Sequence, residues 1–241
     1  DFDLEKQMKK KADSISDKQK KRIEAVISKA LLKNSERAVS KYTETVDGRL
    51  RIKSNPPLIV PIRDLLGKDR DRFDFSHSID EALKIYKESL PAGRRHLIDQ
   101  YEPLELAHKV VGVGSVGLKA WILILMGREN GDPLVLQIKE ANHSVLEAYY
   151  GASVYGKCGR RIVEGQQAIQ NIGDILLGWL RLKTASGSNR DYYVRQLWDS
   201  KYSFDPETLH EDAFDVLSRL CAWTLAHAHA KTGDRHAIAG Y

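Results

Sequence analysis

The chain has 241 residues, of which 42% are hydrophobic and 29% are charged. These proportions are typical of a soluble globular protein and exclude collagenous, mucin-like and wholly disordered chains. The two cysteines, Cys158 and Cys221, stand in no metal-binding spacing, so we predict reduced thiols rather than disulfides or a Cys-based metal site. Because the sequence contains neither a signal peptide nor an apolar stretch long enough to span a bilayer, we expect a cytoplasmic protein with no membrane partner.

The positive charge is concentrated near the start of the chain. Residues 1–53 hold 15 Lys and Arg against 9 Asp and Glu, a net of +6, which leaves −1 for the remainder. A basic segment can bind nucleic acid, with an affinity that falls steeply as salt rises. The lysine runs within residues 6–53 are interrupted by acids and contain no aromatic residue to stack on a base. Nucleic-acid binding therefore rests on charge alone and is not the function that we expect.

The first hundred residues combine helices with one clear β-hairpin. Residues 3–33 are predicted to be helical, because apolar residues recur at three-and-four spacing. Two alternating runs, 42–46 and 49–52, flank Asp47-Gly48. This dipeptide favours a hairpin turn, since both central residues of that turn need positive φ.

Further signals predict a short strand and two helices before residue 104. Residues 58–62 are predicted to be a strand or an extended connector. Ser78-Ile-Asp-Glu81 matches a capping box, which predicts a helix from Ser78 to about Leu90. A second short helix is predicted from Arg94 to Tyr101.

From Glu105 the sequence becomes rich in β-type patterns. The predicted elements are strands at 107–113, 118–126 and 134–138, helices at 144–150 and 160–171, strands at 174–179 and 192–197, and a long helix from Asp205-Pro206 to Gly233. We therefore expect an α+β fold with two parts. Residues 1–104 form a basic helical segment with a β-hairpin at 43–52, and residues 105–241 form an antiparallel β-lobe followed by the long C-terminal helix.

One glycine-rich motif matches a pattern found in nucleotide-binding proteins. Gly112-Val-Gly114-Ser115-Val-Gly117 matches the pattern G-x-G-x-x-G. In a dinucleotide-binding fold this loop must open a helix whose amino end takes the pyrophosphate. Here the loop is followed by Leu118–Leu125, which has the composition of a strand. The sequence therefore does not support a dinucleotide-binding fold.

A glycine loop between two strands is instead what kinases place over nucleotide phosphates. Such a site needs a lysine on the next strand and an acidic residue on the following helix. Lys139 is that lysine, and Glu147 and Glu164 are the candidates for its partner. Residues 192–197 would then be the hinge strand, with Gln196 and Leu197 beside the adenine. The alternative is a plain β-hairpin with a surface lysine.

Several strings resemble one bacterial family. They are Val110–Gly117, Leu136–Ala141 with Ser144–Glu147, Val163–Gln166, Asp174–Trp179, Asp191–Leu197 and Leu220–Ala230. The sequence is similar to the uncharacterised family known as domain of unknown function twenty-two fifty-two, with the likeness running from about Ala38 to Tyr241. This resemblance implies a protein-kinase-like fold, circularly permuted relative to ordinary kinases, of which this chain would be the C-terminal portion.

The resemblance also implies that catalytic-loop and metal-site strings lie upstream of the basic segment, and this chain contains neither. We therefore expect the general base and the metal ligands to come from that upstream part. We expect that this chain alone does not catalyse phosphoryl transfer. Asp234, which follows the long helix, is a weak catalytic candidate, because the asparagine expected five residues later is Ala239. No residue of the chain is assigned as a metal ligand.

The sequence thus predicts a kinase-like domain that binds ATP and Mg²⁺. Gly112, Gly114, Ser115 and Gly117 would cover the phosphates, and Lys139 would neutralise their charge. The predicted function is phosphoryl transfer from the nucleotide to a small molecule or a protein, with an acceptor that the sequence does not identify. The alternative is a non-catalytic, pseudokinase-like nucleotide sensor or a protein-interaction module.

Overall fold

The computed structural model describes residues 35–65, 71–110, 117–128, 132–183, 187–197 and 211–240. The chain divides into two compact units, and each is described by itself. The first contains residues 35–164 and 174–199, and the second contains residues 1–34, 165–173 and 200–241. None of the helices in these described ranges has the length and apolar character needed to cross a membrane.

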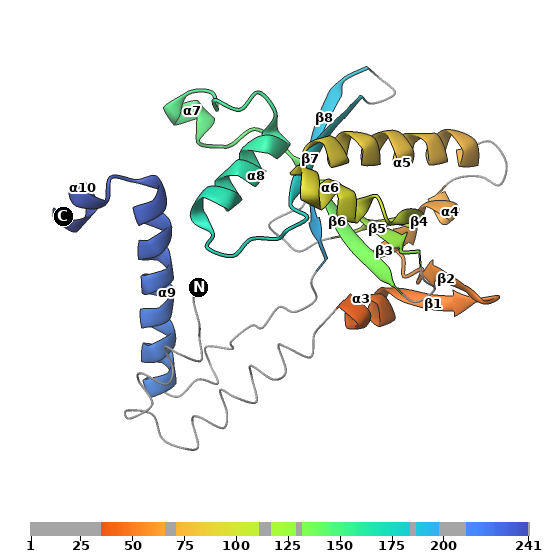
Figure 1. Cartoon of the computed structure of the whole chain (residues 1–241), viewed down its shortest axis with the longest axis horizontal. Helices are drawn as coiled ribbons and strands as arrows, with labels where there is room; N and C mark the ends of the chain where they lie inside the picture. Colours follow the sequence, from red (N-terminus) through yellow and green to blue (C-terminus); the bar gives the residue numbers. More distant parts are fainter. Residues whose placement is uncertain are drawn as a thin grey trace. The chain divides into compact units, whose positions relative to one another are not determined.

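A six-stranded antiparallel sheet organises the first unit (Figure 1). Its strands are β3 (Ile59–Pro61), β4 (Glu102–Lys109), β5 (Ala120–Met126), β6 (Pro133–Ala141), β7 (Gly178–Lys183) and β8 (Asn189–Gln196), in the spatial order β3-β4-β5-β6-β8-β7. The central strand β5 is apolar throughout, and the first four residues of β6 are apolar as well, because both faces of the sheet are covered there. The sheet confirms the predicted α+β class with antiparallel strands and flanking helices.

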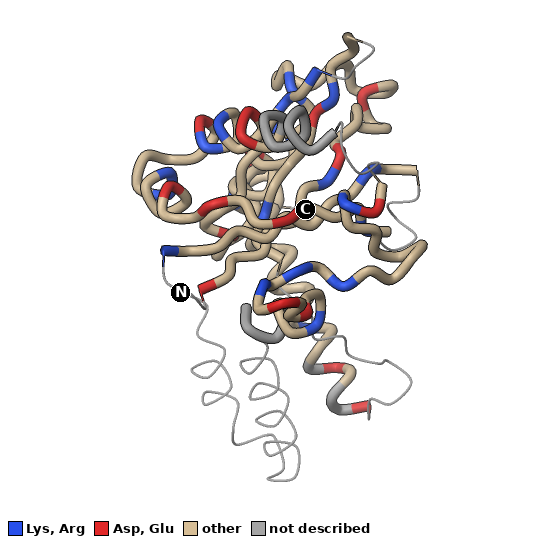
Figure 2. Tube along the Cα trace, turned by 90° about the vertical axis from the view of Figure 1, so that its right-hand side faces the viewer, with Lys and Arg blue, Asp and Glu red and all other residues tan. Residues whose placement is uncertain are grey.

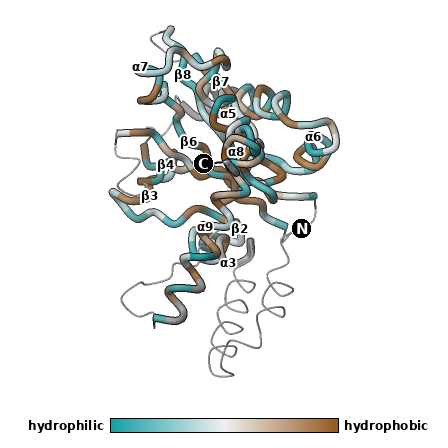
Figure 3. Tube along the Cα trace, turned by 90° about the vertical axis from the view of Figure 1, so that its left-hand side faces the viewer, coloured by the Kyte–Doolittle hydropathy of each residue, from teal (hydrophilic) through white to brown (hydrophobic). Residues whose placement is uncertain are grey.

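Helices α5 (Asp71–Glu88) and α6 (Ala92–Ile98) lie on one face of the sheet (Figure 1). Leu83, Tyr86 and Leu90 pack there against a buried layer that includes Leu136 and Leu180. Burying one such side chain contributes about 1.5–3 kcal/mol. Figure 3 shows the corresponding brown, apolar positions along strands such as β6.

Tyr86 ties α5 to the chain segment before β7. Its side chain is 1% exposed, and its hydroxyl donates a 2.6 Å hydrogen bond to the carbonyl of Leu176. Burial and the nearby Asp174 carboxylate raise the pKa of Tyr86 far above its usual value. The hydroxyl is therefore a permanent donor at physiological pH.

We expect Tyr86→Phe to lower the free energy of unfolding by about 1–2 kcal/mol, because the Leu176 carbonyl loses its donor in a buried place. Urea-induced unfolding measures this difference. Tyr101→Phe is the matched control, since the Tyr101 hydroxyl bonds Asp132 at an exposed site. An equal loss in both variants would contradict this explanation.

The opposite face of the sheet carries a second core at the Val135 end of β6. Helix α3 (Ser35–Tyr42) and the hairpin of β1 (Thr43–Val46) and β2 (Arg49–Ile52) cover it. Asp47 and Gly48 at the turn have φ values of 50° and 73°, which confirms the predicted hairpin. The shared core contains Tyr42, Ile52, Ala107, Ile122, Ile124, Val135 and Leu197.

Glu105 fastens this hairpin to the sheet. Its carboxylate accepts hydrogen bonds from the guanidinium of Arg63 and from the Ile52 amide. Arg63 lies in α4 (Ile62–Leu65) and also donates to the Ile52 carbonyl at 2.8 Å. One ion pair therefore holds β2, α4 and β4 together.

Helices α7 (Glu147–Tyr150) and α8 (Cys158–Ile169) follow β6. The start of α8 lies very close to β8. A Cβ atom at Gly159 would stand 2.2 Å from the Tyr192 carbonyl oxygen and 3.2 Å from the Trp179 Cβ. Only glycine allows this approach.

The described part of the second unit contains residues 165–173, α9 (Glu211–Thr232) and α10 (Arg235–Gly240). Trp223 and His227 stack one turn apart on α9, with ring centroids 4.0 Å apart. The Lys231 ammonium donates to the Gln170 carbonyl at 2.8 Å. The body of α9 agrees with the predicted C-terminal helix, whose predicted start at Asp205 lies outside the described residues.

Two element predictions are wrong. Helix α5 already begins at Asp71, so Ser78 lies inside the helix and does not cap its start. The strand predicted at 174–179 begins only at Gly178. Asp174 bends the chain ahead of this strand, because the Asp174 carboxylate accepts hydrogen bonds from the Leu176 and Gln196 amides. The helix predicted at residues 3–33 lies outside the described residues.

Candidate functional site

The strand register brings Lys139 close to the end of the glycine motif. Gly117 adopts a φ of +83°, a conformation that favours glycine, and β5 begins three residues later at Ala120. Ala120 pairs directly with Lys139 across the β5–β6 ladder. Gly112, Gly114 and Ser115 lie outside the described residues.

Lys139 belongs to the face of the sheet that is opposite α5. Leu134 and Leu136 pack toward α5, and because side chains alternate along a strand, Val135, Gln137 and Lys139 lie on the other face. On that face β8 contributes Tyr193, which is the direct partner of Lys139.

A hollow of about 280 Å³ lies beside Lys139. Three basic side chains line it: Lys119, Lys139 and His143. Glu140 also lines the hollow, but its carboxylate is bound to Arg190 at 2.7 Å and to the Lys119 amide at 3.0 Å. With this acid paired, the side chains around the hollow favour an anion.

The remaining wall of the hollow is apolar or aromatic and includes Ala120, Ile162 and Tyr193. Burial raises the pKa of Tyr193 above its ordinary value, so its hydroxyl stays protonated. Lys and Arg positions elsewhere are interspersed with Asp and Glu along the described trace (Figure 2).

Glu147, one predicted partner of Lys139, anchors the segment after β6. Its carboxylate bonds the His143 imidazole at 2.9 Å and the Ser144 amide at 3.2 Å, and it pairs with Arg161 at 3.9 Å. The hydrogen bond from His143, followed by that from Ser144, holds the pKa of Glu147 below its usual value. Arg161 also donates to the Asn142 carbonyl at 2.8 Å, so this segment is fastened to α8.

Glu164, the other predicted partner, pairs with Arg160 one turn earlier on α8, at 3.1 Å. Both glutamates therefore have an arginine partner on α8, Arg161 for Glu147 and Arg160 for Glu164. Which of them orients Lys139 stays a prediction.

Asp191 fixes the position of α8 against the sheet, a role that the sequence analysis did not identify. It forms two hydrogen bonds with the Arg181 guanidinium, at 2.5 and 2.7 Å. It also accepts the Cys158 amide at 2.6 Å, at the first residue of α8. Burial pushes the pKa of Asp191 up, but the Arg181 and Cys158 hydrogen bonds outweigh it and hold this pKa below its ordinary value.

The two predicted hinge residues lie on different faces of β8. Gln196 pairs with Leu136 and shares its face, which is turned toward α5. Leu197 lies on the face of Lys139 but is only 8% exposed, within the core beneath α3 and the hairpin. The structure therefore brings Lys139 together with Tyr193, and it brings neither Gln196 nor Leu197 into the hollow.

Asp234 caps the last helix. Its carboxylate accepts the amides of His236 and Ala237, at 2.9 and 3.2 Å. This is the geometry of a helix N-cap. Within the described ranges, no group of three or more His, Cys, Asp or Glu side chains could hold a metal ion.

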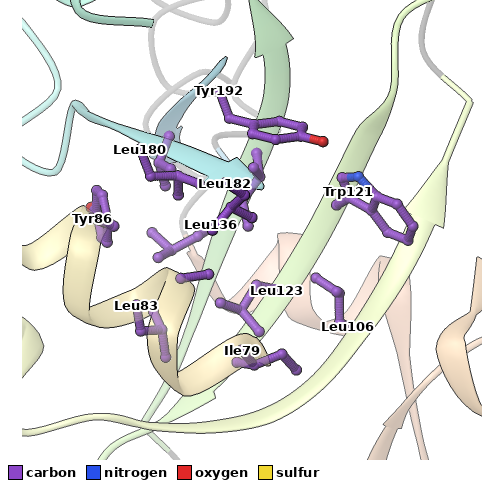
Figure 4. A pocket seen from close by; sticks show the side chains of 13 residues that line it. Ile79, Leu83, Tyr86, Leu106, Trp121, Leu123, Leu136, Leu180, Leu182 and Tyr192 are labelled. Carbon is purple, nitrogen blue, oxygen red and sulfur yellow. The ribbon is translucent and has the colours of Figure 1, made fainter. Parts of the chain in front are cut away.

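A second cavity, of about 190 Å³, lies between α5 and the sheet (Figure 4). Ile79 and Leu83 of α5 face Leu123, Leu136 and other apolar side chains across it. The polar side-chain atoms among its lining residues belong to Tyr86, Trp121 and Tyr192 (Figure 4). Its lining is unsuited to phosphate, so the hollow beside Lys139 is the candidate site.

Comparisons with curated proteins and with solved structures find no match. A family profile described as "Uncharacterized protein conserved in bacteria (DUF2252)" matches residues 2–241. The match includes the basic segment, so the family likeness begins well before Ala38, where the sequence analysis placed its start. Since it covers nearly the whole chain, the chain belongs to this uncharacterised bacterial family.

Proposed function

We propose that this protein is a kinase-like, ATP–Mg-binding domain that serves phosphoryl transfer to a small molecule or a protein. The observation that carries the proposal is the position of Lys139, directly opposite Ala120 and close to the glycine motif, beside a hollow lined by Lys119 and His143. Backbone amides of a glycine loop and a lysine on the next strand are the groups with which kinases hold nucleotide phosphates.

The order of the sheet supports a kinase-like fold. The hairpin that holds the glycine motif, the lysine strand β6 and the proposed hinge strand β8 are neighbours in space. Helix α8 lies between β6 and β8 in sequence and packs beside the lysine face. The circularly permuted arrangement is part of the same proposal.

The described residues fit the phosphate end of a nucleotide better than its other parts. Lys119, Lys139 and His143 suit a polyphosphate, whose oxygens accept charge-assisted hydrogen bonds. Leu197, one of the two residues predicted beside the adenine, is buried in the core. We therefore assign no position to the base of the nucleotide. The described acids form no cluster suited to Mg²⁺, and we assign no step to the metal. ATP would supply the phosphoryl group, and this chain's part is to bind and orient it.

The alternative is a non-catalytic, pseudokinase-like nucleotide sensor or a protein-interaction module. The geometry of Asp234 favours it, because its carboxylate already accepts two helix amides. Phosphoryl transfer by this chain that is lost in Asp234→Asn would contradict the alternative and would identify Asp234 as the base. We propose the cytoplasm as the location, where ATP is available and the free Cys158 and Cys221 stay reduced.

We expect Lys139→Met to weaken ATP binding by roughly tenfold or more, because one charged hydrogen-bond donor to phosphate is lost. Isothermal titration with ATP, ADP and AMP measures this effect, which should be largest for ATP. Lys183→Met removes an exposed lysine at the end of β7 and is the matched control. Equal ATP affinity in the wild-type chain and Lys139→Met would refute the proposed site.

A further inference from the structure

The cavity between α5 and the sheet is larger than the gaps that side-chain packing normally leaves. Its volume is about 190 Å³, whereas protein interiors are packed as densely as organic crystals and contain few voids larger than a water molecule. Its floor consists of core side chains that are at most 2% exposed, namely Leu123, Leu136, Leu180 and Val194. The remaining lining includes half-buried side chains, among them Ile79, Ala82 and Ile138. The cavity therefore opens toward solvent, and a small molecule can enter it.

Two hydrogen-bond donors line this cavity, and neither has an acceptor within the part of the chain that the structure describes. They are the Tyr192 hydroxyl and the Trp121 indole N–H, and in Figure 4 the hydroxyl points toward Trp121. Tyr192 is only 8% exposed, and buried tyrosine hydroxyls and tryptophan N–H groups usually find a partner. The third polar side chain, Tyr86, is already bound to the Leu176 carbonyl. The two unpartnered donors thus indicate that an acceptor is supplied from outside the chain.

The donors lie at the same end of the cavity. Ile138 pairs with Trp121 on one side and with Val194 on the other, and Tyr192 is two residues from Val194 on the same face of β8. Burial, followed by the nearby Glu140 carboxylate, raises the pKa of Tyr192 above its ordinary value, so its hydroxyl stays a donor. None of the described lining residues is charged. Because burying an unpaired charge is costly, the lining favours a neutral acceptor over a carboxylate or phosphate.

We propose that this cavity binds a small neutral molecule with an apolar body and a carbonyl oxygen at one end. An apolar cavity of about 150 Å³ holds one benzene molecule, so a volume of about 190 Å³ suits a molecule slightly larger than benzene. A water molecule, whose share of liquid volume is about 30 Å³, would leave most of this space empty. The cavity lies on the face of the sheet opposite Lys139, so the proposal does not depend on nucleotide binding.

Titration of the full, ¹⁵N-labelled chain with three related probes tests the proposal. Acetophenone, cumene and benzoate share a benzene ring and carry a neutral carbonyl, an apolar branched group and a carboxylate, respectively. The indole N–H signal of Trp121, assigned by its loss in Trp121→Phe, reports binding at the cavity and gives each Kd. We expect acetophenone to bind and to shift this signal, and cumene to bind as well. Benzoate should bind at least roughly tenfold more weakly than acetophenone, because its charge would be buried without a cation.

Tyr192→Phe separates the hydrogen bond from the apolar contact. It should weaken acetophenone binding roughly fivefold and leave cumene binding unchanged, because cumene accepts no hydrogen bond. The melting temperature without a probe should stay the same, since this hydroxyl has no partner to lose. Tyr101→Phe is the matched control, because the Tyr101 hydroxyl bonds Asp132 outside the cavity, and it should bind acetophenone as the wild-type chain does.

Ala82→Leu places extra carbon atoms in the cavity and should abolish the binding of both neutral probes without lowering the melting temperature. Ala148→Leu, at an exposed position of α7, is its matched control and should leave binding unchanged. If the wild-type chain does not bind acetophenone, or if Tyr192→Phe binds it equally well, the proposal is wrong. Acetophenone binding that survives in Ala82→Leu would place the probe elsewhere and would also refute it.

Discussion

Asp191→Ala is expected to lower the free energy of unfolding by about 3 kcal/mol, the low end of the cost of breaking a buried ion pair. The Asp191 side chain is 6% exposed, and that of its partner Arg181 is 31% exposed. The substitution leaves the Arg181 guanidinium without its carboxylate and removes the acceptor of the Cys158 amide. The expected result is a loose start of α8, measured as a lower midpoint of urea-induced unfolding.

Two controls separate this effect from a general sensitivity to charge loss. Asp215→Ala breaks an exposed pair with Arg219 on α9 and should leave the free energy of unfolding almost unchanged. The double variant Arg181→Met/Asp191→Leu removes both charges, so it should be less destabilised than Asp191→Ala. Equal losses in Asp191→Ala and Asp215→Ala would contradict the structural role given to Asp191.

The stabilisation that Asp191 contributes to the folded state should decrease as the pH falls. Folding lowers the pKa of this carboxyl, so the native state binds its proton more weakly than the unfolded chain does. The stabilisation is then present above the unfolded pKa of about 3.9 and is lost as the pH falls through the folded pKa. The stability difference between wild type and Asp191→Ala should therefore shrink below about pH 4, measured by urea unfolding at several pH values. A difference that grows on acidification would contradict this assignment.

Gly159→Ala should destabilise the protein by up to about 3 kcal/mol, although alanine is the better helix former. The new Cβ would stand 2.2 Å from the Tyr192 carbonyl oxygen. That oxygen belongs to the backbone of β8 and cannot turn aside as a flexible side chain could. Helix α8 would have to move away from the sheet, and Ile162, which lines the hollow beside Lys139, would move with it.

Gly165→Ala is the matched control on the same helix, because nothing lies within 4 Å of its added Cβ. This variant should gain up to about 1 kcal/mol from helix propensity alone. If urea unfolding shows that Gly159→Ala lowers the free energy of unfolding and Gly165→Ala raises it, the close approach of α8 to β8 is established. Stabilisation by both would show that α8 does not pack against β8 as described.

The sequence predicted correctly those elements whose structure depends on residues that are neighbours in the chain. Asp47-Gly48 defined a hairpin because its turn requires positive φ. Strands β5 and β6 were predicted because apolar or alternating runs between glycine-rich turns are typical of strands. The strand predicted at 174–179 failed because Asp174 captures two amides and turns the chain first.

The site was less predictable, because its geometry depends on register. Lys139 could be assigned to a strand, but its pairing with Ala120 and Tyr193 requires the sheet. Asp191 and Arg181 are ten residues apart, and nothing local joins them. Their pairing follows only when β7 and β8 align. Gln196 pairs with Leu136 on the face turned toward α5, and its place beside the base stays a prediction.

Thermal unfolding of the full chain with and without millimolar ATP–Mg tests the proposed phosphate site most directly. Binding to the folded state adds RT ln(1 + [L]/Kd), about 2.7 kcal/mol at a hundredfold excess over Kd, which raises the midpoint by roughly 5–10 °C for a chain of this size. We predict this rise for the wild type and for Lys183→Ala, and its loss in Lys139→Ala. No rise in the wild type, or a rise that survives in Lys139→Ala, would contradict the assignment of Lys139 to a nucleotide site.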